Sequence, residues 1–383
     1  MIAWSKDDER LREGIGLWFG KFGEDFARYE RESAFAREPW LAVMESGLLR
    51  LPFDEKWGGL GRSLLTTMYV LEDLGRGCPN SALNFAVTTH MVSTGIALQR
   101  FGSTALKDTY LPRISAGTAI GAHAVTEPGS GSDALGMRTT ATADGDCYRL
   151  SGSKAFVGNG PVADLVVVYA RTEPAAGPLG LTAFLVERDT PGLAFGEPSE
   201  KTGLQSSSPC SLFLDGCRVP KTHILGRVGA GSLVLDHVVT WETLCCFIVG
   251  TGEMRRRLDR CVEYAGERGD FGRPIGGFQA VAHRIVDMKI GLETSRKWLY
   301  DTAEKFAAGR KVTADLATAK LVAGRAALDS ALGAVQVFGG DGGAAGPGLD
   351  RELRGAVAGT IHSGTTGTQY DRIAATLGLG RAA

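Results

Sequence analysis

A surplus of charge of either sign is missing from this chain of 383 residues, in which 42 Lys and Arg are matched by 43 Asp and Glu. Without a basic field, the chain has no electrostatic means of holding a nucleic-acid backbone, so we expect no nucleic-acid partner. Apolar runs of about 18 residues, which could span a bilayer, are also missing, so we expect no membrane association. The segment Met1 to Arg12 alternates charges and lacks the apolar stretch of a signal peptide, which favours a cytoplasmic protein.

Paired cysteines are missing as well. The seven cysteines are an odd number, lie scattered along the chain and form no CxxC pair. This pattern excludes a disulfide framework and the usual zinc spacings, so we expect no metal site. The adjacent Cys245 and Cys246 stand in an apolar context, where small buried side chains are a better interpretation than reactive thiols.

The chain contains three segments of different periodicity. Apolar residues from Leu11 to Phe26 recur at spacings of three and four, and the apolar segments 64–74 and 82–101 predict further helices. Short β-branched and aromatic runs at 165–170 and 181–186, separated by a turn-forming stretch, predict a small antiparallel β domain. Amphipathic helices return from Ser232 onward. This order of helical, β and helical segments is not the alternating pattern of a dinucleotide-binding sheet.

The most informative segment runs from His123 to Asp133 and joins the first helical third to the β third. Its glycines let the backbone bend and approach a ligand closely. The hydroxyls of Thr126, Ser130 and Ser132 can bond a polar ring edge or a phosphate. The composition also fits a Ser/Gly surface loop, whereas the glycine spacing does not match GxGxxG and no βαβ unit surrounds it.

Five motifs, in the correct order, resemble those of the acyl-CoA dehydrogenase family. They are LPF with GGLG at 51–61, AVTEPGSGSD at 124–133, GSKAFVGNG at 152–160, ERGDFGRPI with FQ at 267–279, and QVFGGDG at 336–342. Together they cover almost the whole chain. The resemblance implies an α+β fold with an N-terminal α-helical domain (1–121), a central antiparallel β domain (122–229) and a C-terminal four-helix bundle (230–383). It also implies assembly as a homodimer or homotetramer.

The same resemblance implies an FAD site that a neighbouring subunit helps to cover. The residues expected to hold FAD are Val125, Thr126, Ser132, Phe156, Gly158, Arg268, Phe271, Gln336, Gly340 and Thr365, with Gln279 as a weaker candidate. Phe156 is expected to stack on the flavin where many relatives have Trp, although plain strand packing is an alternative. Arg268 is expected to reach the FAD pyrophosphate across the subunit interface as a charge-assisted contact, with a surface arginine as the alternative.

The chemistry implied by the family needs a carboxylate against the α-carbon of a thioester, because that proton is only weakly acidic. In most relatives this base is the Glu of a Tyr-Glu-Gly-Thr motif near the C-terminus. Here the matching residues are His362, Ser363, Gly364 and Thr365, and a serine hydroxyl without an activating partner is too weak a base. The backbone N–H of Ser363 is left as a candidate donor to the thioester carbonyl. Gly367 replaces a polar residue that is common in relatives.

Some relatives, including the isovaleryl-CoA enzymes, carry the base on another helix, and the matching residue here is Glu242. It lies between two apolar runs, and a poorly solvated carboxylate is a stronger base. A salt-bridged or surface glutamate is the alternative interpretation. Thr243 replaces an arginine that many relatives have after this position. His362 is expected either to pair with Glu242, to touch the thioester, or to pack as an uncharged side chain.

Three hypotheses follow for the function. The first is FAD-dependent α,β-dehydrogenation of an acyl-CoA or acyl carrier protein, with Glu242 as the base, Ser132, His362 and Ser363 near the substrate, and an electron-transfer flavoprotein or oxygen as acceptor. The pairing of Trp241-Glu242 with Ser363-Gly364-Thr365 is similar to enzymes of secondary-metabolite clusters, which often act on carrier-bound acyl groups. The second hypothesis is a flavin monooxygenase on the same fold. The third is a homologue that binds but has lost redox activity.

Overall fold

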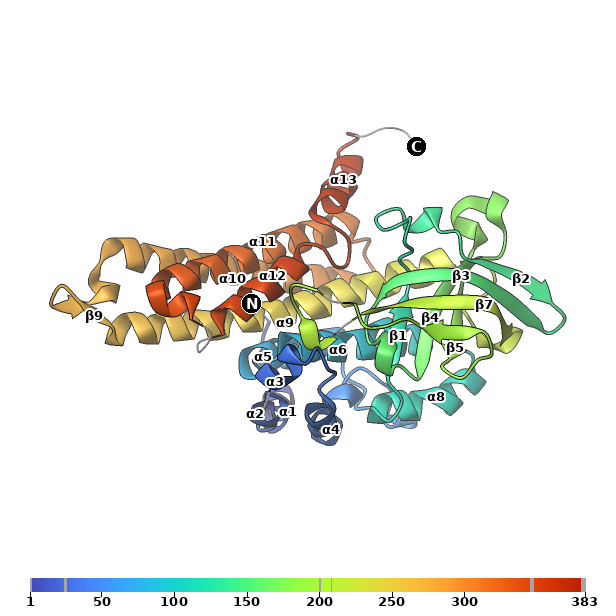
Figure 1. The fold of residues 1–383 in the computed structure, drawn as a ribbon, viewed down its shortest axis with the longest axis horizontal. Coiled ribbons are helices and arrows are strands. Elements are labelled where there is room, and N and C mark those ends of the chain that lie inside the picture. Colours follow the sequence, from blue (N-terminus) through green and yellow to red (C-terminus); the bar gives the residue numbers. More distant parts are fainter. Residues whose placement is uncertain (1, 24–25, 200, 208, 345–347, 380–383) are drawn as a thin grey trace.

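The computed structural model describes residues 2–23, 26–199, 201–207, 209–344 and 348–379 (Figure 1). The N-terminal part is helical throughout. Its helices are α1 (Lys6–Gly16), α2 (Phe19–Phe22), α3 (Phe26–Arg31), α4 (Arg37–Ser46), α5 (Leu64–Gly77), α6 (Ser81–Thr88), the π-helical segment η3 (Thr89–Ile96), α7 (Ala97–Phe101) and α8 (Thr104–Ala116). The periodic segment from Leu11 to Phe26 is therefore split into shorter helices. Glycines at 16, 20 and 23 favour this break because glycine is a poor helix former.

The middle part is an eight-stranded sheet. Its strands are β1 (Gly121–Ala124), β2 (Thr140–Asp144), β3 (Cys147–Val157), β4 (Leu165–Arg171), β5 (Leu181–Glu187), β6 (Leu193–Phe195), β7 (Cys210–Pro220) and β8 (Ile224–Leu225). Most neighbouring pairs are antiparallel, as expected. However, β1 runs parallel to β4 along its whole length, which the sequence did not predict.

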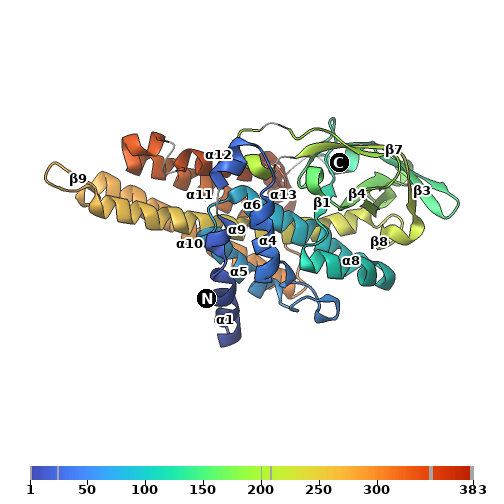
Figure 2. The ribbon, with the colours of Figure 1, turned by 60° about the horizontal axis from the view of Figure 1, so that its bottom comes forward.

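Alternation along β4 shows how the sheet is covered on both faces. Leu165, Val167 and Tyr169 pack against helices α7 and α8 and the start of α9, whereas Val166 and Val168 face a core formed within the β domain. Two views place α8 along the sheet, on the side of the N-terminal helices (Figures 1 and 2). Because both faces are buried, the strand reads as a continuous apolar run instead of alternating with polar residues.

The C-terminal part is a helical bundle that extends away from the sheet (Figure 1). It consists of α9 (Gly231–Glu267), α10 (Gln279–Ala307), α11 (Thr313–Phe338), α12 (Leu349–Gly359) and α13 (Thr366–Thr376), with the two-residue strands β9 (Gly269–Asp270) and β10 (Arg273–Pro274) at its far tip. By length and composition, α9 and the stretch Thr313–Gly343 could cross a membrane, but 50% and 39% of their apolar windows are buried in the protein. Such burial is typical of bundle core helices, and the expected lack of membrane association stays a prediction.

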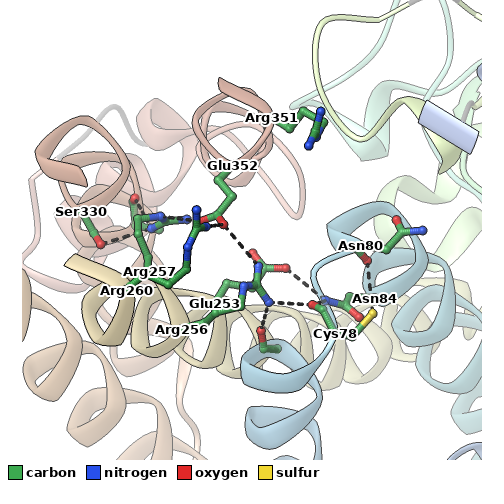
Figure 3. Close-up of polar contacts among 12 residues, drawn as sticks. Cys78, Asn80, Asn84, Glu253, Arg256, Arg257, Arg260, Ser330, Arg351 and Glu352 are labelled. Carbon is green, nitrogen blue, oxygen red and sulfur yellow. Dashed lines mark hydrogen bonds and ion pairs between the residues drawn. The ribbon is translucent and has the colours of Figure 1, made fainter. Parts of the chain in front are cut away.

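Helix α9 crosses α5 at very close range. A Cβ placed on Gly252 would lie 1.9 Å from the carbonyl oxygen of Glu72, and one on Gly75 would lie 2.0 Å from that of Val249. Beyond this crossing along α9, three arginines form hydrogen bonds and ion pairs with neighbouring elements (Figure 3). Arg256 donates to the carbonyls of Gly75 and Cys78, while Arg257 and Arg260 bind Glu352 of α12. The position of α9 is therefore fixed by both the N-terminal helices and the bundle.

Candidate active site

Glu242, on α9, lies where the N-terminal helices, the sheet and the bundle meet. Its side chain is 17% exposed. The hydroxyl of Ser363 donates to Oε1 at 2.6 Å, and the hydroxyl of Ser93 donates to Oε2 at 2.9 Å. The carboxylate is thus enclosed and carries one hydrogen bond on each oxygen, which is not the environment of a surface glutamate on an amphipathic helix.

Two histidines stand beside this carboxylate. The Nδ1 atom of His123 lies 3.9 Å from Oε2 of Glu242, and its Nε2 lies 3.2 Å from the hydroxyl of Tyr169. The Nδ1 atom of His362 lies 3.2 Å from the Ser363 hydroxyl, so His362 reaches Glu242 through that serine. Burial lowers the pKa of His362 to about 4 and also lowers the pKa of His123, and in both cases this outweighs the opposing effect of Glu242. Both rings are therefore neutral near pH 7.

The turn that carries Ser363 has an unusual backbone. Ser363 has a φ of +55° and Gly364 a φ of +94°, in the left-handed region that non-glycine residues seldom occupy. The amide of Gln369, a buried residue of α13, donates to the carbonyls of both residues at 3.2 Å. Lys320 of α11 also donates to the Gly364 carbonyl. These contacts hold the turn in its strained conformation.

Ser93 comes from the π-helical segment η3, where it is 1% exposed. The same segment fixes β1, because Thr94 donates to the carbonyl of Ala122 at 2.8 Å and the Nδ1 atom of His90 accepts from the N–H of Gly121 at 3.1 Å. Single π-helical turns occur often at functional sites. Here, this segment positions both Ser93 and the strand that carries His123.

A buried ion pair holds the backbone of the segment 125–131 in place. The ammonium of Lys154, which is fully buried, lies 2.8 Å from Oε1 of Glu127 and donates to the Val125 carbonyl at 3.2 Å. Burial opposes ionisation of Glu127, but the N–H of Arg138, the Lys154 ammonium and the Thr139 hydroxyl outweigh it and lower its pKa to about 2. The pair keeps the backbone of this segment in place next to the end of β3.

The residues predicted to hold FAD fall into two separate groups. Val125, Thr126, Ser132, Phe156, Gly158 and Thr365 lie in the β domain or at the start of α13, the two parts of the chain that also place His123 and Ser363 beside Glu242. Arg268, Phe271, Gln279, Gln336 and Gly340 lie at the far tip of the bundle, where the rings of Tyr264 and Phe338 stack at 4.1 Å. At 1.5 Å per residue, α9 separates Glu242 from Arg268 by roughly 39 Å. One chain therefore does not bring the two groups together.

Two phenylalanines of these groups point outward. Phe156 is 73% exposed with a φ of +55°, and Phe271 is 88% exposed with a φ of +48°. For Phe156 this excludes simple burial within the sheet, which was the alternative interpretation. Strained backbone of this kind clusters at active sites and at ligand-binding positions.

A cavity of about 70 Å³ lies beside His362, between α6, α9, α11 and α12. It is lined by Phe85, Thr88, Cys246, Phe247 and His362 among others, and the rings of Phe85 and Phe247 lie 5.2 and 5.3 Å from that of His362. Its volume corresponds to about two water molecules at about 30 Å³ each. Within the described ranges, His, Cys, Asp and Glu side chains form no group of three or more that could hold a metal ion.

Sequence reasoning missed several members of this site. Ser93 stands in an apolar helical segment where nothing in the pattern distinguishes it, and Tyr169 lies in a continuous apolar strand. His123 directly precedes the motif at 124–133 and Lys154 lies within the motif at 152–160, but neither motif indicates the contacts of these side chains. The only available signal was the presence of polar side chains within apolar runs.

Models of the three acyl-CoA dehydrogenase domains, N-terminal, middle and C-terminal, match residues 5–118, 122–217 and 229–378. The chain is 37% identical to an L-prolyl-[peptidyl-carrier protein] dehydrogenase of Pseudomonas fluorescens, over 93% of each chain. It is 35% identical to isovaleryl-CoA dehydrogenase of Solanum tuberosum, over 79% of this chain and 73% of the relative.

Comparison with solved structures identifies relatives of the same kind. The prolyl acyl carrier protein oxidase AnaB superimposes with a TM-score of 0.95 at 35% identity, covering 98% of this chain and 100% of AnaB. A structure described as PigA with FAD and proline superimposes with a TM-score of 0.95 at 34% identity, covering 99% of each chain. With its motifs, domain order and fold in agreement, this chain belongs to the acyl-CoA dehydrogenase family.

Proposed function

We propose that this protein is an FAD-dependent enzyme that dehydrogenates a small acyl group held as a thioester on a carrier protein or CoA, with Glu242 as the base. The single observation that supports it best is the 2.6 Å contact between Ser363 and Glu242. Ser363 occupies the position at which most relatives carry their base. The carboxylate of Glu242 projects from α9 and contacts Ser363, so it is placed to act as the base instead.

The reaction removes a proton from the α-carbon and a hydride from the β-carbon. Glu242 takes the proton on a carboxylate oxygen, since each oxygen keeps a free lone pair beside its serine hydrogen bond. His123 and His362 are neutral near pH 7, so neither forms an ion pair with the carboxylate. When bound, FAD supplies the acceptor for the hydride. An electron-transfer flavoprotein or oxygen is needed afterwards to take up the two electrons.

The residues present fit such a cofactor. The exposed Phe156 ring offers a flat apolar surface for a flavin, next to the backbone that Lys154 and Glu127 hold. At the bundle tip, the exposed Arg268 and Phe271 suit a diphosphate and an adenine. Because these groups lie at opposite ends of one chain, we propose that the FAD site is completed by the tip of a second copy, in a homodimer or homotetramer.

The substrate is proposed from the relatives. Two relatives that match at least nine-tenths of both chains are named L-prolyl-[peptidyl-carrier protein] dehydrogenases. We therefore propose a short or small cyclic acyl group, with an L-prolyl thioester on a carrier protein as the first candidate.

The test is anaerobic mixing of the FAD-loaded protein with L-prolyl carrier protein, and separately with isovaleryl-CoA. We expect one of these thioesters to bleach the flavin absorbance and yield an α,β-dehydrogenated product by mass spectrometry. Glu242→Gln should slow the bleaching by about 10²- to 10⁴-fold, whereas Glu304→Gln, at an exposed position on α10, should not. Bleaching of Glu242→Gln at the wild-type rate would refute the base assignment. Oxygen uptake with a hydroxylated product would indicate a monooxygenase.

A further inference from the structure

The two oxygens of Glu242 receive their hydrogen bonds from two irregular stretches of backbone. Ser93 donates from a π-helical segment in the N-terminal part of the chain, and Ser363 donates from a left-handed turn in the C-terminal part. These two stretches are 270 positions apart in the numbering, yet each ends in a hydroxyl on the same carboxylate. Nothing in the proposed reaction requires either hydroxyl to react, so their contacts with Glu242 call for another explanation.

Ser363 is the more informative of the two. At a φ of +55°, glycine would be the least strained residue, and any side chain makes the turn less favourable. The serine side chain does, however, make two contacts, because it donates to Glu242 and lies 3.2 Å from Nδ1 of His362. When His362 donates from Nδ1, the only proton of the hydroxyl is left for Glu242. The strained residue therefore presents a donor of defined direction.

We propose that Ser93 and Ser363 act as a serine clamp, a pair of positioning residues that fix the orientation of the Glu242 carboxylate towards the α-carbon of the substrate. This inference rests on the function proposed above. Holding both oxygens prevents rotation of the carboxylate, and misplacement of a reacting group by about 1 Å can cost a factor of about 100 in rate.

Other polar groups around Glu242 do not replace the clamp. His123 from β1, Tyr169 from β4, Cys246 from α9, Lys320 from α11 and His362 all face it. Of these, His123 has its Nδ1 at 3.9 Å, beyond hydrogen-bond distance, and the two histidines are neutral near pH 7. Lys320 is directed to the Gly364 carbonyl. Loss of either serine hydroxyl therefore removes the hydrogen-bond donor of one Glu242 oxygen, and the neighbouring side chains interact with that oxygen only more weakly.

The test is Ser363→Gly in the FAD-loaded protein, with the thioester that bleaches the wild type. Glycine relieves the backbone strain while it deletes the hydroxyl, so the melting temperature should stay level or rise. The rate of flavin bleaching should fall by about 10- to 100-fold, with little change in KM. The acid limb of the kcat/KM profile should move to higher pH, because a carboxylate that has lost a donor binds a proton more readily. Ser93→Ala should shift the profile in the same direction.

Ser33→Gly is the matched control, because Ser33 is an exposed serine with a φ of +50° outside the site. It should share any gain in melting temperature and leave the rate unchanged. If Ser363→Gly bleaches at the wild-type rate with an unmoved pH profile, while Glu242→Gln is inactive, the clamp is refuted and the proposed function stands. If Ser363→Gly melts well below the wild type, its contacts serve stability and the clamp is also refuted. If no thioester reduces the wild-type flavin, the proposed function itself fails.

Discussion

Gly252 lies on α9 at the point where this helix crosses α5, ten positions beyond Glu242. A methyl group added there would lie 1.9 Å from the carbonyl oxygen of Glu72 and 2.7 Å from the backbone nitrogen of Arg76. Both neighbours belong to the backbone of α5, so no side chain can turn aside to make room. Gly252→Ala must therefore move α9 away from α5 by more than an ångström, against the contacts of Arg256 with Gly75 and Cys78.

The size of the effect follows from two opposing contributions. Overpacking of this kind costs typically 1–3 kcal/mol, and a clash with rigid backbone belongs at about the upper end. Replacement of glycine by alanine inside a helix returns about 1 kcal/mol. At Gly250, on the same helix, an added methyl group meets nothing within 4 Å, so only the gain remains. Because the gain is common to both variants, the free energies of unfolding of Gly252→Ala and Gly250→Ala should differ by the overpacking cost alone, about 3 kcal/mol.

Urea unfolding followed by circular dichroism measures this difference. The Gly252→Ala variant should unfold at a lower urea concentration than the wild type, and Gly250→Ala at the same or a higher concentration. Gly75→Ala, on the opposite side of the crossing, should resemble Gly252→Ala because its methyl group would lie 2.0 Å from the Val249 carbonyl. Equal midpoints for Gly252→Ala and Gly250→Ala would show that the helices are not in contact at this crossing.

Three further predictions concern the ion pair and the bundle tip. Lys154→Met should lower the free energy of unfolding by about 3–5 kcal/mol in urea melts, because it leaves Glu127 buried without its partner. The pKa of Glu127 is lowered to about 2, so the ion pair contributes fully above pH 4.5 and is lost as the pH falls towards 2. Melts of Glu127→Gln against pH should lack this part of the acid-side slope. Phe271→Ser should change the melting temperature of the apoprotein little, since the ring is 88% exposed, but should lower the FAD-to-protein absorbance ratio after gel filtration.

Much of the fold could be predicted from the sequence because the burial of a helix or strand imposes a recognisable pattern on its apolar residues. The apolar run 165–170 became β4, the run 181–186 became β5, and the apolar segment 64–74 became α5, extended to Gly77. The split of the first helix could not be read from apolar spacing, because residues 11, 15, 18, 22 and 26 keep a helical period across the break. The parallel pairing of β1 with β4 depends on how the chain leaves the N-terminal helices, which a local pattern does not encode.

The site was predictable only where a motif carried it. Glu242 was predicted as the base because Ser363 stands where the resembling family has its usual base. The structure places these two side chains in contact, and the catalytic role of Glu242 stays a prediction. Ser93, His123 and Tyr169 come from a buried helix and two strands, and their approach to Glu242 is a result of tertiary packing between distant parts of the chain. The roles of the predicted cofactor residues stay predictions. The distance between the two groups of these residues depends on the length of α9, which the motifs alone do not give.

The separation of Glu242 from the bundle tip along α9 has a genetic consequence if neighbouring chains share each flavin. A Glu242→Gln chain still has a sound tip, and an Arg268→Ala chain still has a sound carboxylate. Neither should work alone, yet co-expression would produce hybrid pairs in which one site combines the two sound parts while the other combines the two damaged ones. Intragenic complementation between such alleles would therefore report the architecture of the assembly without any crystal.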